Sequence, residues 1–283
     1  MEQEQHNNNS RLSIVFIGSG NVAWHMSQSL HEAGHEILQV YSRNLSHAEE
    51  LAKRVNAEAT VQQELINRNA DAYIISVGDD SIAEIAKMLH PILAPGRATK
   101  PQVVMHTAGS VSIDVLHEAS EHTAVLYPMQ TFTKRTSVNF SEIPLFVEAT
   151  DKVAEEVVNC LANSISEHVV AINSEQRCKL HLAAVFASNM ANHCYRLAER
   201  IVNEAGLDFS LYAPLIRETA RKASVMSPRE AQTGPMARGD VKVMSKQLAM
   251  LSDPLMKEVY EVFARSIERD KNKSSCLTTA TFH

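Results

Sequence analysis

Short runs of apolar and β-branched residues alternate with helical patterns over the first 173 residues of the chain. The runs occupy residues 12–17, 37–42, 72–77, 102–106, 123–127, 144–148 and 168–172. Between them, apolar residues recur at the spacing of amphipathic helices. Strands that alternate with helices predict an α/β domain, residues 11–173, whose mostly parallel sheet is covered by helices.

After residue 173 the strand pattern stops. From Ser174 to Ala205 there is neither glycine nor proline, apolar residues follow a helical period, and Gly206 stands where a helix C-cap is expected. Further helical patterns cover residues 211–226, 241–251 and 254–269. We therefore expect an all-α C-terminal domain over residues 174–270, and disordered tails at 1–10 and 271–283.

A glycine-rich turn, GSGNVA, directly follows the first apolar run and precedes a helical pattern. It fits G-x-G-x-x-G/A, in which the first glycine permits a tight turn and the second lets the backbone approach a pyrophosphate. Strand before and helix after favour a dinucleotide-binding Rossmann domain over a simple structural turn. The expected phosphate-binding residues are Gly18, Ser19, Gly20, Asn21 and Val22.

The second apolar run ends at Ser42, Arg43 and Asn44, about twenty residues beyond the glycines. NAD enzymes usually place Asp or Glu here to bind the ribose 2′-hydroxyl. An arginine instead suits a 2′-phosphate, because its guanidinium makes charged bidentate hydrogen bonds. The cofactor is therefore predicted to be NADP. In the alternative, Arg43 is a solvated loop residue.

Ligands of open α/β sheets bind beyond the carboxyl ends of the strands. After the run 72–77, Val77 and Gly78 are expected along the cofactor, and Asp80 is expected to be the N-cap of the next helix. After the run 102–106, a histidine and two hydroxyl residues form a candidate substrate shelf, namely His106, Thr107 and Ser110. His106 would donate a proton, unless it is buried and satisfied by backbone groups.

Weaker candidates follow the run 123–127, where a proline terminates strand pairing. These are Tyr127 and Gln130, of which Gln130 is expected to bind substrate.

The first long helical pattern carries polar residues inside an apolar segment. At about 100° per residue, His181, Ser188 and Asn192 share one stripe, and Asn189 flanks it. Buried polar groups need partners. These polar side chains would either face a cleft over the nicotinamide or form hydrogen bonds to another helix.

The segment TGPMARGD, residues 233–240, is punctuated by two glycines and a proline. Asp240 is expected to cap the following helix, and Arg238 is expected to hold an anionic group of the substrate. The alternative is an interdomain turn in which Arg238 pairs with Asp240.

Composition narrows the partners. With a net charge of -6 there is no broad basic field, so nucleic acid and anionic membrane surfaces are not expected as general partners. No signal peptide or apolar membrane span is apparent, which predicts a cytoplasmic protein. Four well-separated cysteines indicate reduced thiols. The H-E-x-x-H pattern at residues 31–35 is not expected to bind zinc, because Gly34 ends the helix between its histidines.

Five segments together resemble the Rossmann-like proteins that carry the domain of unknown function DUF2520: GSGNVAWHM, HTAG, YPMQTF, HLAAVFASN and TGPMARGD. The resemblance spans residues 12–265. It implies an NADP-binding domain joined to a helical domain similar to the C-terminal domain of 6-phosphogluconate dehydrogenase, and a homodimer formed through the helical domain. It implies no particular substrate.

One departure concerns the β-hydroxyacid dehydrogenases, which place a catalytic Lys and Asn one turn apart on the first interdomain helix. Here Lys179 is followed four residues later by Ala183, so that pair is missing. His181 with Asn189 or Ser188 would stand in its place.

Two functional hypotheses follow. In the first, the protein is an NADPH-dependent oxidoreductase that transfers hydride to a small, anionic carbonyl or imine substrate. His181 or His106 would supply the proton and Arg238 would orient the substrate. In the second, prompted by the missing Lys–Asn pair, it is a non-catalytic NADP(H)-binding sensor or scaffold.

Overall fold

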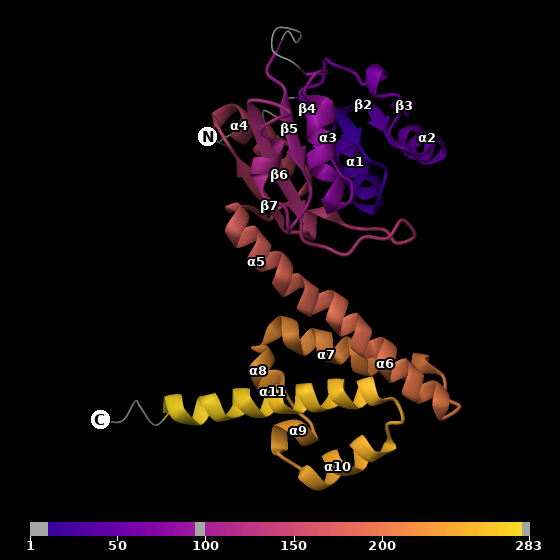
Figure 1. The fold of residues 1–283 in the computed structure, drawn as a ribbon, viewed down its shortest axis with the longest axis vertical. Helices are drawn as coiled ribbons and strands as arrows, with labels where there is room; N and C mark the ends of the chain where they lie inside the picture. Colours follow the sequence, from indigo (N-terminus) through magenta and orange to yellow (C-terminus); the bar gives the residue numbers. More distant parts are fainter. Residues whose placement is uncertain (1–10, 94–99, 279–283) are drawn as a thin grey trace, which may run out of the picture. The chain divides into compact units, whose positions relative to one another are not determined.

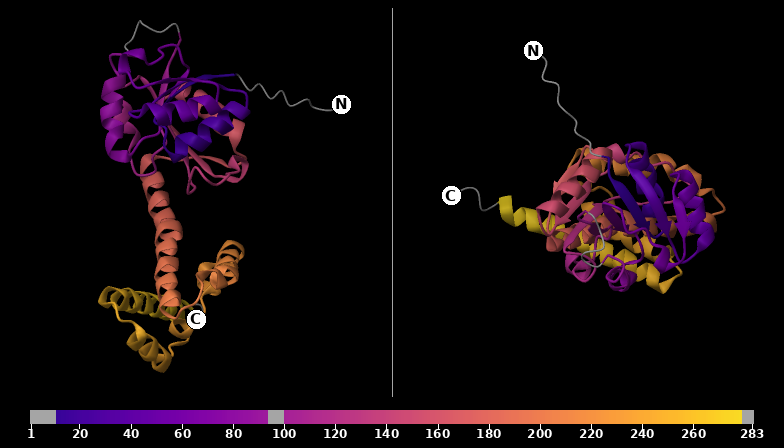
Figure 2. Two further views of the ribbon diagram at one scale, coloured as in Figure 1. Left: turned by 90° about the vertical axis from the view of Figure 1, so that its right-hand side faces the viewer. Right: turned by 90° about the horizontal axis from the view of Figure 1, so that it is seen from above.

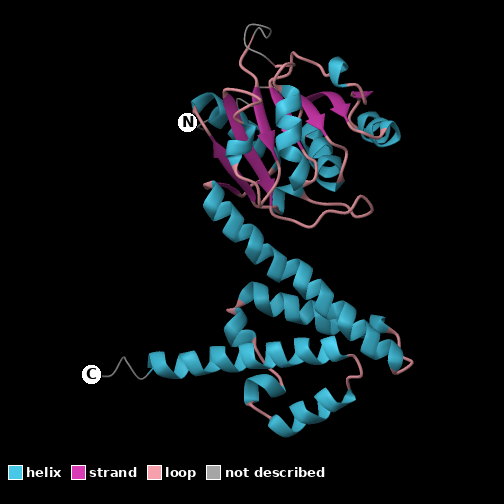
Figure 3. Ribbon diagram, in the orientation of Figure 1, coloured by secondary structure: helices cyan, strands magenta, loops and turns pink. Residues whose placement is uncertain are grey.

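The computed structural model describes residues 11–93 and 100–278, which form two compact units (Figure 1). The first unit, Met1–Met190, contains the eight-stranded sheet, and the described residues of the second, Ala191–His283, form helices without a strand (Figure 3). The boundary lies seventeen residues after the predicted one, at 190 rather than 173. The reason is that the start of the predicted interdomain helix packs on the sheet unit, with Leu180 against Val125, Tyr127 and Phe146.

The sheet has eight strands in the order β3-β2-β1-β4-β5-β6-β7-β8. Only the pair β6–β7 is antiparallel, so the predicted mostly parallel sheet is confirmed. The strands are β1 (Ser13–Ile17), β2 (Glu36–Tyr41), β3 (Glu58–Thr60), β4 (Ala72–Ile75), β5 (Val103–His106), β6 (His122–Pro128), β7 (Leu145–Ala149) and β8 (Val169–Ala171). Seven match predicted runs, and β3 was missed because three residues are too few to show an alternating pattern.

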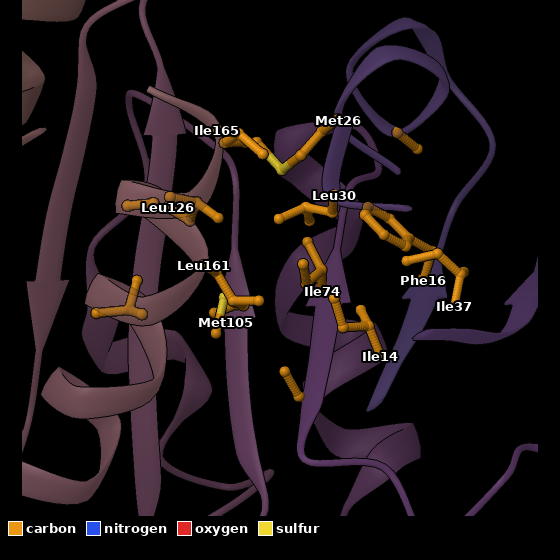
Figure 4. Close-up of a cluster of buried hydrophobic side chains, with 14 of the residues drawn as sticks. Ile14, Phe16, Met26, Leu30, Ile37, Ile74, Met105, Leu126, Leu161 and Ile165 are labelled. Atoms are coloured by element: carbon orange, nitrogen blue, oxygen red, sulfur yellow. The ribbon is translucent and has the colours of Figure 1, made fainter. Parts of the chain in front are cut away.

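Helices cover both faces of the sheet. Alternate residues of each buried strand point to opposite faces, so separate clusters of core residues form on the two sides of the sheet. On one face, Met26 and Leu30 of α1 and Leu161 and Ile165 of α4 pack on the sheet (Figure 4). On the other face, α3 packs on the sheet through Ile82, Ala86 and Leu89.

The helices of this part are α1 (Asn21–Glu32), α2 (Leu45–Arg54), α3 (Ile82–Leu89), α4 (Lys152–Ile165) and the start of the long helix, α5 (Ser174–Ala184). Short 3₁₀ turns occupy η1 (Gln63–Leu65), η2 (Asp79–Ser81), η3 (Ile113–Leu116) and η4 (Phe140–Glu142). Helix α1 ends at Glu32, and Gly34 with φ 96° separates it from His35. The two histidines of residues 31–35 therefore do not share a helical face, as predicted.

The predicted helix from Ser174 to Ala205 is continuous but not uniform (Figure 2). A π-helical segment, η5 (Val185–Met190), separates α5 from α6 (Ala191–Glu204). Gly206 ends the helix with φ 72°, and the N–H of Leu207 donates to the Val202 carbonyl at 3.1 Å. This is a Schellman cap, so the predicted C-cap glycine is confirmed.

The remaining elements are η6 (Phe209–Tyr212), α7 (Ala213–Val225), α8 (Pro228–Ala231), α9 (Pro235–Arg238), α10 (Val241–Met250) and α11 (Pro254–Thr278). Helix α11 continues beyond its predicted end at residue 269, into the segment predicted as a tail; the other predicted tail, 1–10, lies outside the described residues. Among the described helices, none has the length and apolar character that a membrane span requires. Among the described residues, Cys160, Cys178 and Cys194 are not joined in disulfides.

Candidate functional site

The glycine turn between β1 and α1 forms an anion-binding corner. Gly18 has φ 115°, and a Cβ there would lie 2.2 Å from the Ser76 carbonyl oxygen of the neighbouring strand end. Gly20 is the N-cap of α1, and its carbonyl accepts from Trp24 N–H at 2.9 Å. The first turn of α1 carries no acidic residue. Its free N–H groups and positive dipole end therefore suit a phosphate.

A cavity of about 950 Å³ opens at the carboxyl ends of the parallel strands. Its volume lies at the upper end of the range for cofactor sites. Most of the residues predicted for the site line it: Gly18, Ser19, Gly20, Asn21, Val22, Ser42, Arg43, Val77, Gly78, Thr107, Gln130 and His181. Residues from five strand ends thus meet in one space, which fits the rule for open α/β sheets.

At the end of β2, Ser19 and Ser42 are linked through their hydroxyl oxygens at 2.9 Å. Arg43 is exposed beside them, and no carboxylate among the described residues forms an ion pair with it. Its guanidinium is therefore available to an external anion. His47, which sequence reasoning did not single out, also lines this part of the cavity.

Asn44 has a different role from the one predicted. Its side-chain oxygen accepts from the backbone N–H of His47 at 3.2 Å and from the Ser46 hydroxyl at 2.7 Å. It is the N-cap of α2 and is not among the cavity-lining residues. The amide is occupied by the helix start, so the prediction of a cofactor contact is not supported.

The prediction for Asp80 as a helix cap is wrong. Asp79 and Asp80 lie in the turn η2, and the N-cap of α3 is Ser81, without a side-chain hydrogen bond. Asp79 lines the cavity, and its carboxylate accepts from the Ser110 hydroxyl. Ser110 itself does not line the cavity; it holds Asp79 from the next strand end. The sequence contained the signal, two adjacent aspartates, but not which one faces the site.

His106 lies behind the site rather than in it. Its side chain is fully buried in β5, and its Nδ1 accepts from the Ala108 N–H at 3.1 Å. Burial, reinforced by the nearby Arg177 charge, lowers the pKa of His106 to about 4. A neutral imidazole that does not line the cavity is a poor proton donor, so this prediction is corrected. The alternative stated above, a buried histidine bonded to backbone, describes it better.

Tyr127 and His181 form the polar pair of the cavity. Tyr127 is the last residue but one of β6 and is 8% exposed, and its hydroxyl lies 3.1 Å from the His181 Nδ1. The two rings meet edge to face at 5.9 Å. Burial raises the pKa of Tyr127 and Asp79 adds to this, while the positive charge of Arg177 opposes it. The sequence ranked Tyr127 as a weak candidate because its partner lies 54 residues away, on α5.

Ser188 and Asn189 do not join this pair. They lie in the π-helical segment, where the Ser188 hydroxyl donates to the Asn189 side chain at 3.1 Å, and neither lines the cavity. The predicted stripe assumed about 100° per residue throughout. A π segment turns by less per residue, so residues within it and after it leave the stripe of His181.

Arg238 belongs to the helical unit. It ends α9, between Gly234 with φ 99° and Gly239 with φ 72°. Asp240 caps α10 as predicted, accepting from Val243 N–H at 3.1 Å. The role of Arg238 in holding an anionic substrate stays a prediction.

The loop after β6 is fastened to α1. The Thr133 carbonyl lies 2.9 Å from the His25 Nε2, and Phe132 stacks on the His25 ring. Two cations lie over the Trp24 ring, the Arg54 guanidinium at 4.4 Å and the Lys134 ammonium at 4.5 Å from the ring centroid. The loop that carries Gln130 into the cavity is thus held against the helix that follows the phosphate turn.

Two family descriptions match the chain. "NADP oxidoreductase coenzyme F420-dependent" matches residues 13–108, and "Domain of unknown function (DUF2520)" matches residues 143–267. No curated protein matches the chain.

Among solved structures, the chain resembles a candidate NADP oxidoreductase from Bacteroides fragilis, with 40% identity and a TM-score of 0.85 over 92% of this chain and 99% of that one. A protein from Thermotoga maritima is 24% identical, with a TM-score of 0.71 over 90% and 99%. A pyrroline-5-carboxylate reductase from Coxiella burnetii shares the fold at 16% identity, with a TM-score of 0.58 over 93% and 98%.

Proposed function

Because the chain belongs to the family of NADP oxidoreductases that carry DUF2520, we propose that it reduces a small carbonyl or imine compound with NADPH. The observation that carries this proposal is the Tyr127–His181 pair, which lies in the same cavity as the phosphate-binding turn. The further proposal that the substrate carries a negative charge rests on the predicted role of Arg238 alone.

The residues present fit NADP. A side chain at Gly18 would fill the space beside Ser76 that the tight turn needs, and α1 offers unpaired N–H groups to the pyrophosphate. Arg43 and Ser42 would hold the 2′-phosphate by charged hydrogen bonds. Val77 and Gly78 would lie along the rest of the cofactor. When bound, NADPH supplies a hydride to the electrophilic carbon of the substrate.

The chain must then provide a proton to the substrate oxygen or nitrogen, which gains an electron pair. Tyr127 suits this task because its hydroxyl lies in the cavity and still carries its proton at neutral pH, although burial raises its pKa and so makes it a weaker acid than a free phenol. His181 stands behind it at 3.1 Å and resupplies the proton through Nδ1. Asp79, Thr107 and Gln130 line the same cavity and offer hydrogen bonds that orient the substrate.

The cofactor half of the proposal is tested by calorimetric titration with NADPH and NADH. We expect a preference for NADPH that is lost in Arg43→Ala, because the variant removes the partner of the 2′-phosphate. Arg11→Ala is the matched control, since Arg11 is an exposed arginine that precedes β1 and pairs with Glu36. Failure to bind either nucleotide would contradict the proposal.

The catalytic half is tested by NADPH oxidation with a panel of carbonyl and imine compounds. The enzymatic function is supported if the wild type turns over any of these compounds and the rate falls in Tyr127→Phe and in His181→Ala. Tight NADPH binding with no turnover across the panel would favour the alternative, a dinucleotide-binding sensor or scaffold.

We also propose a homodimer formed through the helical unit. Among its described residues only three hydrophobic side chains are buried, Val202, Met256 and Ala264. Large apolar side chains remain exposed, among them Leu211, Leu215, Val241, Met250 and Leu255. Such surface is typical of an interface rather than of an isolated domain. Sedimentation equilibrium at micromolar concentration tests this: a monomer would contradict it.

A further inference from the structure

Arg177 is the largest fully buried side chain in the described part of the chain, with 1% exposure. It lies on α5, four residues before His181, so the two share one face of the helix, one turn apart. Burial of an arginine requires partners for its charge and its donors. The terminal nitrogens of Arg177 have partners on β7, in the loop after β5 and in the first turn of α5 itself, while Nε has none among the described residues.

The guanidinium donates from Nη1 to the Glu148 carboxylate of β7 and from Nη2 to the Val111 carbonyl. Val111 lies in the loop after β5, which also carries Thr107 and Gly109 into the cavity. Ser174 joins the same network. Its hydroxyl donates to Glu148 at 2.8 Å, its backbone N–H donates to Glu148 at 2.9 Å, and its oxygen accepts from Ile113 N–H at 3.1 Å.

The buried Arg177–Glu148 pair is not explained by a gain in folding stability. The free-energy cost of removing two charges from water is often as large as the attraction between them. Apolar residues of similar volume at the same positions often stabilise a protein as well or better. The network instead fixes the position of helix α5. Its hydrogen bonds fix the rotation and height of α5 relative to β7 and to the loop after β5.

The site next to the network tolerates little displacement. The His181 imidazole rests on Gly109, where an added Cβ would lie 2.4 Å from Nδ1, and it reaches Tyr127 at 3.1 Å. A shift of α5 by about 1 Å would break that hydrogen bond or drive the ring into the loop.

We propose that Arg177, paired with Glu148, is a positioning residue that holds His181 over Gly109 and against the Tyr127 hydroxyl. The inference rests on the proposed function, in which Tyr127 and His181 deliver the proton. The charge of Arg177 also acts on the pair directly: although burial raises the pKa of Tyr127, the guanidinium lowers it.

The test uses the full chain labelled with 3-fluorotyrosine and ¹⁹F NMR. The chain has six tyrosines, and the Tyr127 signal is assigned by its loss in Tyr127→Phe. His181→Ala defines the signal position when the histidine is absent. We expect Arg177→Lys to move the Tyr127 signal most of the way to that position, and to leave the other tyrosine signals in place.

A second variant guards against loss of folding. Arg177→Met combined with Glu148→Leu removes both charges together. This destabilises a protein less than removing one partner, which would leave the other charge buried and unpaired. It is expected to fold and to shift the Tyr127 signal in the same way. Lys179→Met is the matched control, because Lys179 lies on the same helix in an exposed pair with Glu175 and should shift nothing.

An unshifted Tyr127 signal in the folded variants would overturn the proposal. So would loss of folding in both variants, because the network would then be needed for the whole unit rather than for His181. NADPH affinity is expected to stay at the wild-type value in the folded variants. A wild-type protein that fails to bind NADPH would contradict the proposed function, while the fluorine signal still decides the positioning role.

Discussion

The imidazole of His181 occupies the space that a side chain at Gly109 would need, since an ideal Cβ there would lie 2.4 Å from Nδ1 and 2.9 Å from the His181 Cβ. Gly109 does not have a positive φ, so the glycine is required by this close approach and not by its backbone conformation. The loop after β5 and helix α5 are therefore matched in shape at one point, beside the Tyr127 hydroxyl.

Gly109→Ala is expected to push the His181 ring away from Tyr127. Overpacking of this kind costs about 1–3 kcal/mol of unfolding free energy, and turnover should fall with it. Urea unfolding and NADPH oxidation measure the two effects. Gly78→Ala is the control for the unfolding measurement alone, because Gly78 has φ −62° and no atom within 4 Å of an added Cβ. Equal stability of wild type and Gly109→Ala would contradict the steric argument.

Tyr127→Phe removes the proton donor and leaves the ring in place. We expect the rate of NADPH oxidation with an identified substrate to fall by about 10²–10⁴, the usual contribution of general acid catalysis, while NADPH affinity stays constant. Tyr41→Phe provides the comparison, since Tyr41 lines the same cavity near Ser42 and Arg43. Undiminished turnover in Tyr127→Phe would remove this tyrosine from the mechanism.

His106 should make the protein sensitive to mild acid. Its pKa is about 4 in the folded chain and about 6.5 when unfolded, so the unfolded state binds more protons between these values. The contribution of His106 to the free energy of unfolding is then fully present above pH 6.5 and is lost as the pH falls toward 4. The expected loss between pH 7 and pH 5 is about 2 kcal/mol.

Urea unfolding at these two pH values checks the effect, and His106→Leu should reduce the pH dependence. His31→Gln, a change at an exposed histidine of α1, should leave it as in the wild type. The same pH dependence in His106→Leu would show that other groups cause it.

Asn44→Ala separates a helix cap from a cofactor contact. Loss of the cap of α2 should cost about 1 kcal/mol of unfolding free energy, with the preference for NADPH over NADH unchanged. Thermal unfolding and calorimetry on the same samples report both quantities. A lost preference, as expected for Arg43→Ala, would instead restore Asn44 to the cofactor site.

The sheet and the phosphate turn could be predicted because their signals are local. Buried strands are continuous apolar runs, and Gly18 and Gly20 stand directly between a strand and a helix. Their consequences do not depend on distant parts of the chain. The same holds for the Schellman cap at Gly206.

The centre of the site could not be predicted, because it depends on contacts between distant segments. An arginine in the polar segment around Arg177 resembles a surface residue until Glu148, 29 residues earlier, is placed beside it. His106 and His181 both stand next to apolar residues, and only strand pairing shows that the first is enclosed within the sheet. The π-helical turn likewise leaves no periodic signal, which is why Ser188 and Asn189 were grouped with His181.

Trp24, which is in contact with both Arg54 and Lys134, is the single tryptophan of the chain. Its emission therefore reports on one place, where the helix after the phosphate turn meets the loop that carries Gln130. Any ligand that moves Lys134 away from the indole changes the local field on that ring. Trp24 emission is therefore a label-free signal for any binding event that displaces Lys134 from the indole.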